Sequence, residues 1–226
     1  MPVDRERERD LAPVSPARLG TALVLLLTLG VAGAAATQLG GPQAFTNDGP
    51  SMEPTLGNGD RFLIERYGLW LGFLPLAHWG EPAQGDVVVV ASARDQVLIV
   101  KRVIAVGGQH VVVDQAGVSV DGERVAEEAG PCAEFPELRI GTLGSYQPLP
   151  DESCTVYEET LGDSRHFVLD TGYGLRPAEM VVPEGHVFVM GDHRDRSNDS
   201  TNPVLGAVPV ENVIGRMMGV YWTDGS

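Results

Sequence analysis

Residues 85–106 read GDVVVVASARDQVLIVKRVIAV, and the expected fold follows from this stretch. A turn at Gly85-Asp86 precedes the apolar run 87–91, and a second polar turn leads into the run 97–106. Short β-branched runs separated by turn residues are typical of neighbouring strands. Beyond the N-terminal segment the chain contains no apolar helical period of ten or more residues. We therefore expect this part to be mainly β.

Lys101 stands inside the second run and is the single lysine among sixteen lysine and arginine residues. On an edge strand it would be an ordinary surface lysine. In a buried strand its ammonium would be desolvated, which lowers the pKa by up to about 3–5 units when burial is complete. A neutral amine is a general base, and a general base needs a nucleophile to serve.

Residues 49–56, GPSMEPTL, offer a nucleophile in Ser51. Gly49 and Pro50 predict a turn from which the hydroxyl projects, while neighbouring N–H groups stay free to hold an oxyanion. Taken alone, a Gly-Pro-Ser turn is a common loop.

Residues 191–200, GDHRDRSNDS, crowd acids, arginines and serines between apolar runs. The plain interpretation is a charged surface loop. The alternative is that an arginine pairs with an acid and that a serine hydroxyl holds the amine of Lys101.

Other segments add strands and turns. Asp121-Gly122 predicts a two-residue hairpin, and residues 161–164 predict another. Residues 181–190 and 213–221 are expected to close the chain as strands.

The N-terminus contains an uncharged apolar run, Leu19–Leu39. As a helix it would span about 30 Å, the thickness of the hydrocarbon core. Arginines precede it, so the N-terminus is expected to stay cytoplasmic, with everything after about residue 40 outside. The alternative is a cleavable signal peptide, because 34–36 has the small-residue pattern at which such peptides end.

The net charge of −15 argues against a nucleic-acid partner. The two cysteines, Cys132 and Cys154, show no zinc-ligand spacing, so no metal is expected. On the exported side they would form a disulfide, which would stabilise the folded protein by about 3 kcal/mol. The alternative is two independent buried thiols.

Aromatic residues gather shortly after the expected anchor. We expect Met52, Trp70, Phe73 and Trp79 to face the substrate or the membrane. For the aromatic residues, ordinary core packing is the alternative.

In order along nearly the whole chain, these segments resemble the bacterial type I signal peptidases, membrane-anchored Ser–Lys proteases that remove signal peptides. The resemblance rests on the N-terminal apolar run and on residues 51–56, 85–86, 101–104 and 191–200. It implies two antiparallel sheets, with an insertion between the lysine strand and the last motif. The expected organisation is a cytoplasmic N-terminus (1–18), an anchor (19–40), a linker (41–48), a catalytic core in two parts (49–109 and 184–226), and a β insertion with the disulfide (110–183).

The resemblance also implies roles. Ser51 would be the acylated nucleophile, with its backbone N–H in the oxyanion hole, and Lys101 the general base. Ser197 would orient the Lys101 amine. Gly49 stands where some members have a serine whose hydroxyl adds a second oxyanion donor, which is absent here.

Ion pairs would stabilise the site, formed by Arg102 with Asp192 and by Arg194 and Asp199 nearby. Two positions depart from the family pattern. His193 replaces the usual asparagine. Thr201 stands where an arginine usually pairs with the aspartate equivalent to Asp199, which must then find another partner.

The implied substrate is an exported preprotein with small residues at positions −1 and −3. The implied location is the cytoplasmic membrane of a bacterium, single-pass, with the catalytic part on the outer face against the bilayer. No cofactor or metal is expected. Alternatives are a specialised relative that processes one pilin or secretion substrate, and a catalytically silent, membrane-tethered β module. A Ser–His–Asp triad is disfavoured, because the adjacent Asp192 and His193 would point to opposite faces.

Overall fold

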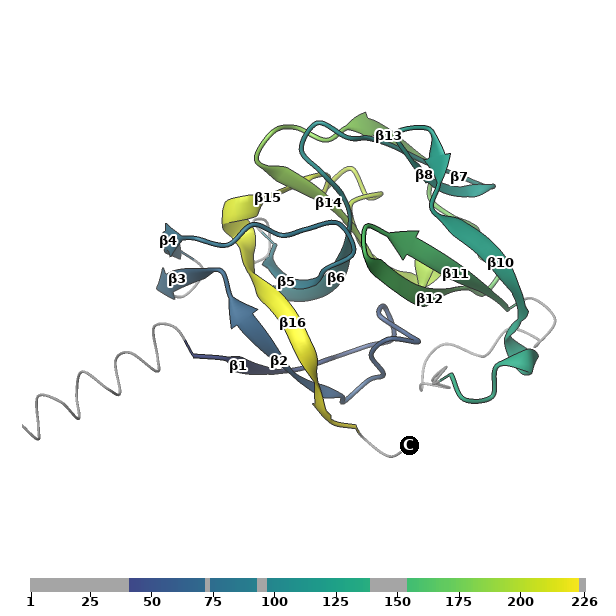
Figure 1. Cartoon of the computed structure of the whole chain (residues 1–226), viewed down its shortest axis with the longest axis horizontal. Helices are drawn as coiled ribbons and strands as arrows, with labels where there is room; N and C mark the ends of the chain where they lie inside the picture. The colour runs from purple at the N-terminus through teal and green to yellow at the C-terminus, as the bar shows by residue number, and fades with distance from the viewer. Residues whose placement is uncertain (1–40, 72–73, 93–96, 139–153, 224–226) are drawn as a thin grey trace, which may run out of the picture. The chain divides into compact units, whose positions relative to one another are not determined.

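The computed structural model describes residues 41–71, 74–92, 97–138 and 154–223 (Figure 1). These residues are almost entirely strands and turns, so the mainly-β prediction is confirmed. Among them, no helix has the length and apolar character needed to cross a bilayer. The expected anchor at 19–40 and the cytoplasmic N-terminus at 1–18 lie outside the described residues.

The largest sheet has seven strands in the order β1-β2-β16-β5-β6-β14-β15 (Figure 1). Their bounds are β1 Gln43–Thr46, β2 Arg61–Arg66, β5 Val87–Ala91, β6 Leu98–Val106, β14 His186–Met190, β15 Val208–Pro209 and β16 Val213–Trp222. The strands that precede residue 110 in this sheet thus pair with strands that follow residue 183.

Residues between these two groups form smaller sheets. One has four strands, β7 His110–Asp114, β8 Gly117–Val120, β9 Glu123–Arg124 and β13 Ala178–Val181; another has three, β10 Ala126–Pro131, β11 Thr155–Leu161 and β12 Ser164–Asp170. A separate hairpin joins β3 Gly68–Leu71 to β4 Leu74–His78. Short 3-10 turns are η1 Cys132–Glu134, η3 Arg194–Arg196 and η4 Val210–Asn212.

The expectation of two antiparallel sheets is right in strand direction and wrong in number. The named strands pair antiparallel throughout, but the described residues divide into four sheets. Hairpins with two-residue turns, such as the one at Asp121-Gly122, close strands locally into small sheets. Both residues of that turn have positive φ, 53° and 84°, as the hairpin prediction requires.

The central strand β5 explains why residues 87–91 are apolar without alternation. All five of its residues are buried. Val87, Val89 and Ala91 pack into one apolar cluster, and Val88 and Val90 pack into another on the opposite face. A strand covered on both faces reads as a continuous apolar run.

Two segments differ from the expected strand bounds. The predicted linker at 41–48 contains β1, which pairs with β2 because Phe45 stacks on Phe62 with ring centroids 6.0 Å apart. The expected strand at 181–190 is broken in two, because Pro183 and Gly185, with φ 71°, turn the chain between β13 and β14.

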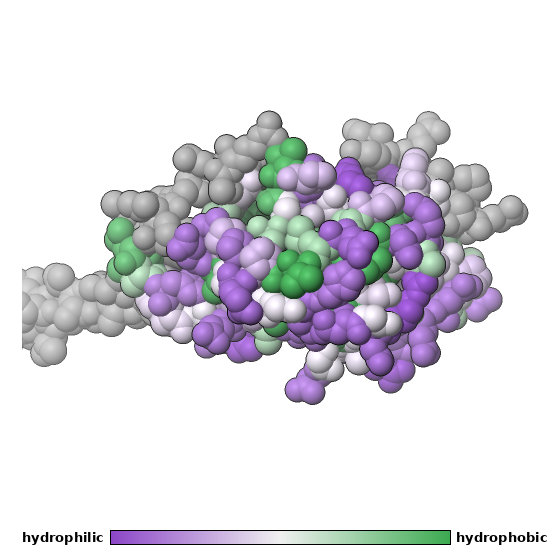
Figure 2. All heavy atoms as spheres, turned by 90° about the horizontal axis from the view of Figure 1, so that it is seen from above, coloured by the Kyte–Doolittle hydropathy of each residue, from purple (hydrophilic) through white to green (hydrophobic). Residues whose placement is uncertain are grey.

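Hydrophilic residues cover most of the face shown in Figure 2, and hydrophobic residues form small separate groups on it. The apolar side chains of the sheets are gathered in buried clusters instead. This distribution agrees with the net charge of −15.

Candidate active site

The loop between β1 and β2 carries Ser51. The Asn47 side chain closes this loop by donating to the carbonyl oxygens of Gly49, Leu56 and Gly57, at 3.0, 3.2 and 2.9 Å. These bonds hold the loop in a compact turn, as the Gly-Pro-Ser motif predicts.

Met52 anchors the loop in the core, so its predicted place facing substrate or membrane is wrong. Its side chain is fully buried and packs with Leu56, Phe62 and Ile64. The side chain that follows Ser51 points into the core, and the apolar thioether of Met52 fits there. The burial fixes the backbone from which Ser51 projects.

The structure brings Ser51 and Lys101 together across fifty residues of sequence. Lys101 Nζ lies 2.9 Å from Ser51 Oγ and donates to the Val100 carbonyl at 2.7 Å. The Lys101 side chain is 3% exposed. Burial lowers the pKa of Lys101 from 10.5 to about 8, although Asp199 and Asp192 oppose this shift. In its neutral form, the Lys101 amine could therefore accept the proton of the Ser51 hydroxyl.

The Ser197 side chain and the Ser51 carbonyl both lie next to Gly191. A Cβ built on Gly191 would meet the Ser51 carbonyl oxygen at 2.3 Å and Ser197 Oγ at 2.5 Å, so only glycine fits. Ser197 Oγ is buried and makes no hydrogen bond to any described residue. Its predicted bond to the Lys101 amine is not made in this structure.

Gly49 adopts φ 98°, a left-handed conformation that disfavours a serine there. Its N–H donates to Asn58 Oδ1 at 2.7 Å, so this donor is already used. The Gly49 N–H therefore cannot replace the second oxyanion donor that this chain lacks.

Arg102 and Asp192 form the predicted ion pair. Arg102 Nε and Nη2 donate to the two Asp192 oxygens at 2.8 and 2.7 Å, and both side chains are buried. The Thr55 hydroxyl bonds to both partners. This pair thus holds the Ser51 loop against strand β6, which carries Lys101.

Asp199 forms hydrogen bonds with Thr201 in place of the expected ion pair with an arginine. The Thr201 hydroxyl donates to Asp199 Oδ1 at 2.7 Å, its N–H donates to the same oxygen at 3.1 Å, and the Gly191 N–H donates to Oδ2 at 3.1 Å. Thr201, which stands in place of the expected arginine, therefore supplies hydrogen bonds to Asp199.

His193 is buried, with Nδ1 3.6 Å from Glu53 Oε2 and Nε2 3.7 Å from Asp195 Oδ1. Its backbone N–H donates to the Ser51 carbonyl at 3.2 Å. The ring faces carboxylates on both sides, whereas the amine that contacts the Ser51 hydroxyl is that of Lys101.

Arg194 pairs with Glu159 of β11, a partner that the sequence interpretation did not identify. The His166 ring also bonds to Glu159, at 3.0 Å. The pKa of Glu159 falls to about 2: burial alone would raise it, but the charge of Arg194 and the hydrogen bonds outweigh burial. The strand pattern could have indicated that Glu159 is buried and needs a partner, because Glu159 lies on the same face of β11 as Leu161.

Of the expected membrane-facing aromatics, Trp79 is 56% exposed, and its Nε1 donates to the Arg66 carbonyl at 3.2 Å. Trp70 lies in β3, but its side chain, like Phe73, lies outside the described residues.

Cys132 and Cys154 form the predicted disulfide. The bond ties the end of β10 to the start of β11, where the Cys132 N–H also donates to the Cys154 carbonyl at 3.0 Å. It therefore lies in the expected insertion, outside the group of residues around Ser51.

Comparisons with known proteins agree with this geometry. The family model described as "Signal peptidase, peptidase S26" matches residues 18–222. A signal peptidase I from Pseudomonas aeruginosa is 34% identical over 193 residues, which are 77% of this chain and 63% of that protein. A signal peptidase I from Pseudomonas fluorescens is 33% identical over 188 residues, 76% of this chain and 61% of that protein. The chain thus spans under two thirds of the length of these relatives.

A crystal structure of a signal peptidase I from Enterococcus faecalis V583 overlaps 61% of this chain and 97% of its own, at 21% identity and a TM-score of 0.36. This overlap is too weak to support a conclusion about fold.

Proposed function

Because the chain belongs to the signal peptidase family, peptidase S26, we propose that it is a membrane-anchored serine endopeptidase that removes N-terminal signal peptides from exported preproteins. The observation that carries the proposal is the 2.9 Å contact between Ser51 Oγ and the buried amine of Lys101. The relatives named signal peptidase I support the same activity.

In the proposed mechanism the neutral Lys101 amine takes the proton of Ser51 as the hydroxyl attacks the scissile carbonyl. The resulting ammonium protonates the leaving amine, which departs as an acyl-enzyme forms on Ser51. A water molecule then loses a proton to Lys101 and attacks the acyl carbonyl. As the ester bond breaks, the Lys101 ammonium returns this proton to Ser51 Oγ, and the signal peptide leaves with a new C-terminal carboxyl group. The Ser51 backbone N–H is proposed to hold the oxyanion.

Ser197 keeps its proposed role in orienting the amine. A neutral amine has two N–H groups and one lone pair. One N–H donates to the Val100 carbonyl, and the lone pair serves the Ser51 hydroxyl. The second N–H needs an acceptor, and the buried Ser197 hydroxyl, which has no other partner among the described residues, supports this assignment.

The proposed location is the cytoplasmic membrane of a bacterium, with residues 19–40 as a single anchor and the catalytic part on the outer face. The proposed substrates carry small residues at −1 and −3. The exposed Trp79 and Leu76 of the β3–β4 region support an approach to the bilayer at this hairpin.

Incubation of the full-length protein in detergent with several unrelated preproteins tests the proposal. We expect cleavage of each after a small residue, and no cleavage by Ser51→Ala. Cleavage of a single preprotein would indicate the specialised relative. The absence of cleavage would support the catalytically silent module and contradict the proposal.

A further inference from the structure

The hairpin β11–β12 presents three polar side chains toward the candidate site. Glu159 is fully buried, the His166 side chain is 8% exposed, and Ser164 is half-buried. Their neighbours Glu158 and Arg165 pair with each other on the other face, where Arg165 is 71% exposed. One face of this hairpin is thus an ordinary charged surface, whereas the other is a buried polar cluster.

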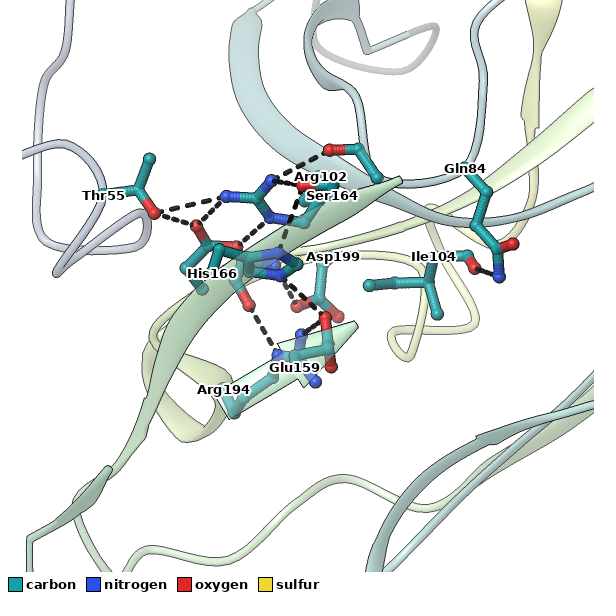
Figure 3. Close-up of polar contacts among 12 residues, drawn as sticks. Thr55, Gln84, Arg102, Ile104, Glu159, Ser164, His166, Arg194 and Asp199 are labelled. Carbon is teal, nitrogen blue, oxygen red and sulfur yellow. Dashed lines mark hydrogen bonds and ion pairs between the residues drawn. The ribbon is translucent and has the colours of Figure 1, made fainter. Parts of the chain in front are cut away.

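Ser164 completes the hydrogen bonding of Arg102. A guanidinium has five N–H donors. Two bond to Asp192, one to Thr55 Oγ1, one to the Gly85 carbonyl at 2.8 Å, and the fifth to Ser164 Oγ at 3.4 Å (Figure 3). Loss of Ser164 would leave one donor of a buried cation without a partner.

His166 links Ser164 to the next ion pair. Its Nδ1 lies 3.3 Å from Ser164 Oγ, and its Nε2 lies 3.0 Å from Glu159 Oε1, which also accepts from Arg194 (Figure 3). One tautomer of the His166 ring gives these three contacts consistent donors and acceptors: Arg102 donates to Ser164, Ser164 donates to Nδ1, and the Nε2–H donates to Glu159 Oε1.

The contacts close into a ring. Arg194 Nε donates to the Gly191 carbonyl at 3.1 Å, and the next residue is Asp192, the partner of Arg102. The ring therefore connects three segments: β6 beside Lys101, the hairpin β11–β12, and the motif at 191–200. We name it the Arg102 ring: Arg102, Ser164, His166, Glu159, Arg194, Gly191 and Asp192.

We infer that the hairpin β11–β12 is a positioning element of the reaction, in which Ser164 and His166 hold Arg102 and thereby keep Lys101 and the Ser51 loop at reacting distance. Arg102 directly follows Lys101 in β6, and its guanidinium also bonds to Thr55 in the Ser51 loop. The inference rests on the proposed function, because it assigns a role within the same site. It gives the insertion a part in the chemistry that the sequence alone did not indicate.

Ser164→Ala in the full-length protein is the primary test, because it removes the fifth acceptor of Arg102 without changing a charged residue. We expect kcat on a preprotein to fall about tenfold with KM unchanged, because a shift well under 1 Å misplaces the dyad. His166→Gln keeps an N–H donor for Glu159, but its only side-chain acceptor belongs to the same terminal amide and does not take the place of Nδ1 next to Ser164, so it should act in the same direction. Glu158→Gln, on the exposed face of the same hairpin, is the matched control and should leave kcat unchanged.

A second measurement needs no substrate. Selective isotope labelling of the single lysine gives one side-chain NMR signal, whose titration reports Lys101. The charged groups acting on Lys101 are Asp192 and Asp199, and both favour its ammonium. Ser164→Ala weakens the pairing of Arg102 with Asp192, so the midpoint should rise, whereas a purely structural role would lower the melting temperature and leave the midpoint in place.

The outcomes separate the two proposals. Wild-type protein that fails to cleave any preprotein contradicts the proposed function, while the lysine titration still tests the ring. Wild-type kcat and an unmoved Lys101 midpoint in both Ser164→Ala and His166→Gln would overturn the inference. A variant that melts below the assay temperature is replaced by the other: both break the bond between Ser164 and His166, but only Ser164→Ala also removes an acceptor of Arg102.

Discussion

Gly191→Ala offers a mutation whose effect can be worked out from distances. The new Cβ would lie 2.3 Å from the Ser51 carbonyl oxygen and 2.5 Å from Ser197 Cβ. Ordinary contact begins at 3.4 Å, so the Ser51 carbonyl must retreat by about 1 Å. Because that atom belongs to the backbone, no side-chain rotation relieves the clash, and the His193 N–H bond to the same oxygen is lost.

A displacement of about 1 Å at a reacting group costs about a hundredfold in rate, which is about 2.7 kcal/mol of activation free energy. We therefore expect kcat for preprotein cleavage to fall by about that factor in Gly191→Ala. Gly219→Ala in β16 is the control, because a Cβ there meets nothing within 4 Å. Both proteins should be assayed below their melting temperatures, measured by circular dichroism. If Gly191→Ala folds and keeps kcat within about threefold of wild type, the argument that Gly191 sets the position of Ser51 is refuted.

Three further changes test separate parts of the account. Lys101→Arg should be inactive although it keeps a cation, because arginine is not deprotonated in proteins; measurable cleavage would exclude Lys101 as the base. Thr201→Val removes a hydroxyl bond to the buried Asp199 and should lower the free energy of unfolding by about 1–3 kcal/mol in a urea titration; an unchanged value would show that the bond contributes nothing. Cys132→Ser, which breaks the bond to Cys154, should destabilise the protein by about 3 kcal/mol with kcat unchanged; a loss of kcat in the folded variant would place the disulfide in the chemistry.

Local patterns were enough to predict several of the strands and to single out Ser51 and Lys101. The apolar run 87–91 is correctly predicted to be a strand, because burial on both faces selects apolar residues at every position. The turn at Asp121-Gly122 is correctly predicted because positive φ favours these two residue types. Lys101 was found because one charged residue in an apolar run conflicts with its surroundings. Such conflicts are visible without knowing the fold.

Local patterns do not predict partners that depend on the packing of distant segments; the pair of Arg102 with Asp192 was implied by the family resemblance. Thr55 bonds to Asp192 across 137 residues, and Arg194 meets Glu159 across 35. The periodicity of a single strand does not show which strand faces pack together, so the contact of Glu159 with Arg194 is not predicted from the sequence. The place of Met52 is wrong for a related reason: it adjoins the candidate nucleophile Ser51, but its side chain packs into the apolar cluster beneath the loop.

The titration of Lys101 tests the central claim most directly. Since the chain has one lysine, the full-length protein in detergent micelles, labelled at lysine, gives a single side-chain signal. The account predicts a midpoint of about 8, because burial lowers the pKa of this amine. Cleavage should rise with pH through the same midpoint, since the ammonium cannot accept the Ser51 proton and the neutral amine can. A midpoint near the ordinary lysine value of about 10.4, or cleavage that follows a different titration, would contradict the dyad.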